Sequence, residues 1–72
     1  RDRYMVNGAA YHNGQKVAEL TDVGFNNVDD VIARLVTMLP EDIPNRSMVM
    51  FKIVNLDKNQ TVVYQRQKGK GF

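Results

Sequence analysis

Cysteine is absent from this 72-residue chain, tryptophan is absent as well, and histidine occurs once. Without thiols, neither disulfide bonds nor thiolate-ligated zinc can reinforce the fold. A chain of this length buries only about 60% of the surface that its unfolded form exposes, so it has room for one modest core. We therefore expect a single domain of marginal stability, which self-association would reinforce.

Residues suited to catalysis or metal binding are equally scarce. His12 is the only imidazole, and the sequence places no carboxylates around it for a metal site. Ser47 is the only serine and has no nucleophile motif around it. Neither Gly-x-Gly-x-x-Gly nor a Walker sequence occurs. We predict a non-enzymatic protein with no cofactor, metal or evident small-molecule substrate; the alternative is a subunit whose active site a partner completes.

Long apolar runs are also missing. No run approaches the about 18 residues that a membrane span requires, and no charged-then-apolar leader opens the chain. We expect a soluble, cytoplasmic protein that does not bind membranes. Because the chain begins with Arg1 instead of Met, we also expect it to be a piece of a longer protein. The formal net charge of +2 is too small to imply an anionic partner, although the basic residues gather at the two ends.

The first quarter of the chain carries strand and turn signals. Residues 3–12 are rich in Tyr, Val and Met and predict a strand, with a bulge or a tight turn at Asn7-Gly8. Asn13-Gly14 predicts the stronger turn, since both residues accept a positive φ at little cost. Residues 15–21 are again of strand length, so a hairpin is expected over residues 3–21.

The clearest predicted element is a helix from Val28 to Leu39. Asn26-Asn27 supplies a capping side chain, and Asp29 and Asp30 fall in the first turn, where negative charge favours the helix dipole. Pro40 ends the helix because proline lacks the amide donor. The apolar residues follow the i, i+3, i+4, i+7 spacing of one buried face: Val28, Val31, Ile32, Leu35, Met38 and Leu39.

A second hairpin is expected after a connector over residues 41–47. Residues 48–55 are apolar almost throughout, which predicts a strand covered at least partly on both faces. Residues 56–59 have turn composition, and residues 60–67 return as a polar-flanked strand. The prediction is an α+β fold of ββαββ order, with a four-stranded, mainly antiparallel sheet and one helix on one face. Residues 1–67 form the domain, and residues 68–72 are expected to be a flexible basic tail.

Our leading functional hypothesis follows from the ratio of one helix to four strands. A helix of about three turns is too narrow to cover such a sheet, so we expect apolar side chains on the other face to be left for a partner. The alternative is that these side chains simply fill the core of a monomer. We predict a small interaction module that self-associates through its sheet, as an accessory or regulatory protein, with a homodimer or another protein as its partner. Lys52 interrupts an apolar strand, either as a guard of a sheet edge or as a contact residue. The candidate partner-binding residues are Met48, Met50, Lys52 and Val54.

The alternative hypothesis is nucleic-acid binding. Aromatic side chains on a sheet stack on bases, and basic side chains neutralise phosphates. Aromatic residues at strand positions are nevertheless more often part of the core, and basic chain ends often serve solubility alone. The candidate nucleic-acid-binding residues are Arg3, Tyr4, Tyr11, Tyr64, Arg66, Lys68 and Lys70.

Overall fold

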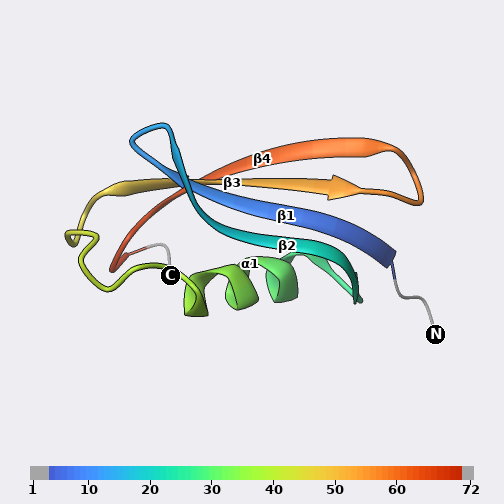
Figure 1. Cartoon of the computed structure of the whole chain (residues 1–72), viewed down its shortest axis with the longest axis horizontal. Coiled ribbons are helices and arrows are strands. Elements are labelled where there is room, and N and C mark those ends of the chain that lie inside the picture. The colour runs from blue at the N-terminus through green and yellow to red at the C-terminus, as the bar shows by residue number, and fades with distance from the viewer. Residues whose placement is uncertain (1–3, 71–72) are drawn as a thin grey trace.

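The protein forms one antiparallel sheet with one helix on it (Figure 1). The computed structural model describes residues 4–70. The order ββαββ confirms the predicted α+β fold, and the sheet order is β2-β1-β3-β4, so β1 and β3 are the central strands. The elements are β1 (Tyr4–His12), β2 (Gln15–Phe25), α1 (Val28–Thr37), β3 (Met48–Asn55) and β4 (Gln60–Gln67).

The first hairpin turns where the sequence predicts it. Asn13 and Gly14 both have positive φ, 54° and 79°, as a tight turn between twisted strands requires. Strand β2 continues beyond residue 21, because Gly24 stays paired with Met5 of β1 and Phe25 with Tyr4. The end predicted for this strand, residue 21, is therefore wrong, because the glycine at position 24 weakens the strand but does not stop its pairing.

No turn forms at Asn7-Gly8, and the bulge expected there lies in β2, opposite Asn7. Between the pairs Val6–Val23 and Gly8–Leu20, the single residue Asn7 of β1 stands opposite two residues of β2. One of these two is Asp22, whose φ is 53° and whose amide donates to Asn7 Oδ1 at 2.8 Å. The bulge thus bends the hairpin while β1 keeps a regular pairing with β3 on its other side.

The helix begins at its predicted cap and ends earlier than predicted. Asn27 Oδ1 accepts a hydrogen bond from the Asp30 amide at 3.0 Å, which satisfies one of the free donors of the first turn. The helix ends at Thr37 instead of Leu39. The Leu39 amide donates to Val36 O at 3.2 Å, so the last turn tightens ahead of Pro40, which disfavours helical geometry at the residue before it.

The core lies between α1 and the face of the sheet beneath it. The helix packs against β2, β1 and β3 (Figure 1). Within residues 4–70 it does not pack against β4. Gly8 of β1 lets the helix come close, since a Cβ atom there would lie 3.1 Å from Val31 Cγ1. The buried cluster consists of Val6, Ala10, Ala18, Val31, Ile32, Leu35, Val49, Phe51 and Ile53.

Hydrogen bonds join the residues after β4 to the connector before β3. The Lys68 amide donates to Ser47 O at 2.8 Å, and the Arg46 amide donates to Lys68 O at 2.9 Å. The Lys68 ammonium also donates to Ile43 O, and the Lys70 amide donates to Gln67 O. The flexibility predicted for residues 68–72 stays a prediction, and residues 71 and 72 lie outside the described part of the chain.

Candidate interaction surfaces

Within residues 4–70, no helix or strand packs on the face of the sheet opposite α1. Side chains alternate between the two faces of a strand, so the residues between the buried positions of β1 and β3 point away from α1. In β3, Val49, Phe51 and Ile53 are buried under the helix, whereas Met50 and Lys52 are exposed on the other side. We call this second surface the open face; its principal residues are Tyr11, Met48, Met50, Lys52, Val54 and Val63.

All four candidate partner-binding residues lie on the open face. Met48 is 54% exposed and Met50 is 39% exposed, so neither fills the core of the protomer. Val54 is half-buried on the same face. The helix of the described chain packs on the opposite side, so the partial cover expected on this face of residues 48–55 stays a prediction that a partner would fulfil.

Lys52 stands in an inner strand. Its neighbours across the sheet are Ala9 of β1 and Val63 of β4. The edge strands are β2 and β4. The interpretation of Lys52 as a guard of a sheet edge is therefore wrong, since a residue between two hydrogen-bonded neighbours protects no free edge.

The candidate tyrosines divide between the two faces of the sheet. Tyr4 and Tyr64 pack against the buried cluster on the helix side. Tyr11 lies on the open face, directly opposite Met50 in β3. The three rings therefore do not form one stacking platform. Arg3 lies outside the described residues.

The remaining basic candidates gather at one end of the sheet. Arg66, Lys68 and Lys70 follow one another at the end of β4, and the guanidinium carbon of Arg66 lies 5.8 Å from the centre of the Tyr64 ring. The fold adds Arg46, which is bound to Lys68 through the backbone and lines the same shallow depression as Lys68 and Lys70. We call these four residues the basic end. Sequence reasoning missed Arg46, because nothing local connects the connector to residues beyond β4.

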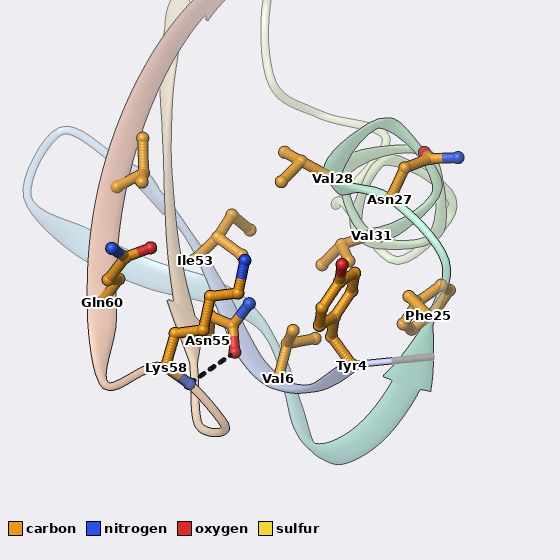
Figure 2. Close-up of a pocket in the computed structure, with 11 residues that line it drawn as sticks. Tyr4, Val6, Phe25, Asn27, Val28, Val31, Ile53, Asn55, Lys58 and Gln60 are labelled. Carbon is orange, nitrogen blue, oxygen red and sulfur yellow. Dashed lines mark hydrogen bonds between the residues drawn. The ribbon is translucent and has the colours of Figure 1, made fainter. Parts of the chain in front are cut away.

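A groove on the helix side was not predicted at all. It runs between α1 and the β3–β4 hairpin, with a volume of about 220 Å³ (Figure 2). Its walls are mainly apolar, with Val28 and Val31 from the helix facing Ile53 from β3 (Figure 2). It exists because α1 does not reach β4, which leaves Val62 of that strand 44% exposed.

Among the described residues that line the groove, Lys58 carries a charge. Lys58 in the β3–β4 turn places its ammonium 5.3 Å from the centre of the Tyr4 ring. The turn itself is fixed by the Lys58 amide, which donates to Asn55 Oδ1 at 3.1 Å (Figure 2). Asp57 accepts from the Met5 amide at 3.1 Å and ties the same turn to the start of β1. The spacing of strand residues gives no signal of this groove, since it depends on where the helix lies.

The described residues form neither a metal-binding cluster nor a membrane-spanning helix. Residues 4–70 contain no group of three or more His, Asp or Glu side chains placed to hold a metal ion. No helix in the described part of the chain has the length and apolar character needed to cross a membrane. Comparison with known proteins found no matching family, no matching curated protein and no matching solved structure.

Proposed function

We propose that this chain is a small, non-enzymatic interaction domain that self-associates through the open face of its sheet and serves as an accessory or regulatory protein. The observation that carries this proposal is the exposure of Met48, Met50 and Val63 on one side of the sheet. Apolar side chains gathered on one surface favour association, because contact with a partner removes them from water. Methionine suits such a surface, since its unbranched side chain adapts to a facing partner.

The size of the open face also supports the proposal. Four strands spaced about 4.8 Å apart, each eight or more residues long, give a projected area of roughly 500 Å². The accessible area is larger, because the side chains stand out from the sheet. A stable interface of standard size buries about 800 Å² on each partner, with smaller ones near 600 Å². The open face therefore approaches what a modest dimer needs.

The test is the oligomeric state of paired methionine variants. Met50 is 39% exposed on the open face, and Met38 is 42% exposed at the end of the helix, so the two are matched in exposure but not in position. Sedimentation equilibrium at micromolar concentration should show a dimer for the unchanged chain. Met50→Lys should give a folded monomer, because a charge replaces apolar contact area, whereas Met38→Lys should remain dimeric.

Two results would contradict this proposal. The first is a monomer for the unchanged chain throughout the micromolar range. The second is a dimer that Met38→Lys disrupts and Met50→Lys leaves intact, which would move the interface from the sheet to the helix side. Far-ultraviolet circular dichroism of each variant establishes that any dissociation is not unfolding.

Nucleic-acid binding is a second candidate, and the basic end favours it. Arg46 joins three of the predicted basic residues there, and Arg66 lies over the ring of Tyr64, which together offer phosphate contacts beside one aromatic side chain. Fluorescence anisotropy of a labelled single-stranded oligonucleotide tests it. Binding should weaken steeply with salt, because each phosphate contact releases a counterion.

Charge removal at opposite ends of the sheet provides the control. Arg66→Ala should weaken oligonucleotide binding and lower its salt dependence, whereas Lys58→Ala, in the turn at the far end of β4, should have little effect. An equal loss in both variants would indicate general charge attraction. No binding at low salt would remove this candidate.

A further inference from the structure

One row of residues across the open face carries opposite charges on its two sides. Strand pairing places Glu19 of β2 opposite Ala9 of β1, and Ala9 in turn opposite Lys52 of β3. Lys52 is followed across the sheet by Val63 of β4. All four residues point to the same side, because directly opposed residues of antiparallel strands share a face. The row therefore runs from a negative charge, across a small apolar residue, to a positive charge.

This row distinguishes between the two ways of stacking a second copy on the open face. Stacked sheets keep their strands nearly aligned, so a two-fold axis lies in the interface either parallel or perpendicular to the strands. A perpendicular axis through the row lays Lys52 over the partner's Lys52, which brings like charges together. A parallel axis midway between β1 and β3 exchanges β1 with β3 and β2 with β4. Lys52 then lies over the partner's Ala9 and one strand, about 4.8 Å, to the side of the partner's Glu19.

We propose that two copies of this chain stack by their open faces about a two-fold axis parallel to the strands, with Lys52 of each copy paired to the partner's Glu19. This inference rests on the proposed function and specifies its partner and its orientation. Stacked sheets lie about 10 Å apart, a spacing that two long side chains reaching toward each other can span. Ala9 between the two charges leaves space for both side chains.

The pairing also accounts for a lysine in an otherwise apolar stretch of β3. A charge that loses water on association is costly unless an opposite charge meets it. The charged group facing Glu19 within the protomer is Lys16, whose ammonium lies 3.3 Å from Glu19 Oε2, and both side chains are about half exposed. In the dimer Glu19 lies between Lys16 and the partner's Lys52. The same arrangement favours a second copy of this chain as the partner, and it disfavours the stacking about a perpendicular axis that brings Lys52 over the partner's Lys52.

Charge-reversed chains test the pairing. Lys52→Glu gives a chain with Glu at positions 19 and 52, and Glu19→Lys gives a chain with Lys at positions 19 and 52. Each variant alone should dimerise at least tenfold more weakly than the unchanged chain, since like charges then meet twice across the axis. An equimolar mixture should recover the dimer as a heterodimer, detected by native mass spectrometry with one chain labelled with ¹⁵N. Lys58→Glu, the same charge change off the open face, should dimerise like the unchanged chain.

The outcomes separate this inference from the proposed function. A dimer of the unchanged chain that both reversals leave at full affinity overturns the pairing and keeps self-association. Weakened single variants whose mixture stays monomeric also overturn the pairing, because the charges would then matter individually and not as partners. A monomeric unchanged chain overturns both proposals. Circular dichroism of each variant shows that the chain tested is folded.

Discussion

Gly8 of β1 faces Val31 of α1 without room for a side chain between them. A Cβ atom added at Gly8 would lie 3.1 Å from Val31 Cγ1 and 3.2 Å from Leu35 Cδ1. The two neighbours come from successive turns of the helix, so they set its distance from the sheet over that stretch. Gly8 does not have a positive φ, and its role here is therefore spatial and not conformational.

Gly8→Ala should lower the free energy of unfolding by about 1 kcal/mol. Overpacking a filled core costs about 1 to 3 kcal/mol, and the smaller freedom of the unfolded chain returns about 0.4 to 1 kcal/mol. Urea denaturation measures the difference. In a Val31→Ala background the same change should cost less, because the nearest clashing methyl group is gone. An equal cost in both backgrounds would contradict the contact.

The bulge in the first hairpin makes a second prediction, at Asp22. Its φ of 53° is a conformation that glycine adopts without steric cost, whereas a β-branched residue does not. Asp22→Gly should leave the free energy of unfolding unchanged or raise it, and Asp22→Val should lower it by about 1 to 2 kcal/mol. Thermal unfolding followed by circular dichroism gives the comparison.

A substitution at Asn7 tests the same bulge from β1, because Asn7 accepts the hydrogen bond of the Asp22 amide. Removing its side-chain oxygen by Asn7→Ala leaves the Asp22 amide without its 2.8 Å partner and should cost about 1 kcal/mol. Ala9 lies two residues from Asn7 along β1, on the same face, and takes no part in this hydrogen bond. Ala9→Ser should therefore cost less than Asn7→Ala. Equal costs at Asn7 and Ala9 would show that the hydrogen bond does not stabilise the bulge.

The helix cap gives a third prediction. Asn27→Ala should destabilise the protein by about 1 kcal/mol, because the Asp30 amide loses its acceptor, and Asn27→Ser should restore most of the loss. The neighbouring change Asn26→Ala is the control, since the cap is Asn27. Chemical denaturation of the three variants ranks them. A larger loss for Asn26→Ala than for Asn27→Ala would place the cap one residue earlier.

The residues after β4 give a fourth prediction. Deleting residues 68–72 removes the two backbone hydrogen bonds between Lys68 and the connector and the bond from its ammonium to Ile43 O. At about 0.5 to 1.5 kcal/mol each, the loss should be about 2 kcal/mol. Deleting only residues 71–72 is the control and keeps these bonds. If both deletions leave the free energy of unfolding unchanged, residues 68–72 act as the flexible tail that the sequence predicts.

Local signals were sufficient wherever one chemical feature decides the backbone. Asn13-Gly14 predicted its turn, Asn27 predicted its cap, and the apolar spacing after it predicted the helix. The two strands of the second hairpin have the predicted limits, 48–55 and 60–67. The errors lie at the end of β2, predicted at residue 21, and at the end of the helix, predicted at Leu39. Pairing of Gly24 with Met5 extends the strand, and the tightening before Pro40 shortens the helix.

The candidate sites also divide into those that local sequence predicts and those that depend on distant segments. Alternation along residues 48–55 was enough to put Met48, Met50, Lys52 and Val54 on one face, because a strand exposes alternate residues whatever its neighbours are. Alternation did not show which face the helix covers. It also gave no hint that Arg46 belongs with Lys68, or that a groove lies beside Val62, because both depend on segments distant in the sequence.

The amino-acid sequence by itself determined the order of the strands and the helix along the chain, the first turn, the helix cap and which residues of β3 share a face. These depend on interactions within a few residues, where rotation about the backbone and the spacing of apolar groups leave little choice. Only the tertiary structure decided the sheet order β2-β1-β3-β4, the side of the sheet on which α1 packs and the row that joins Glu19, Ala9 and Lys52. Those relationships join residues as far apart in the sequence as Ala9 and Lys52, and strand pairing together with the packing of one narrow helix on a wider sheet fixes them.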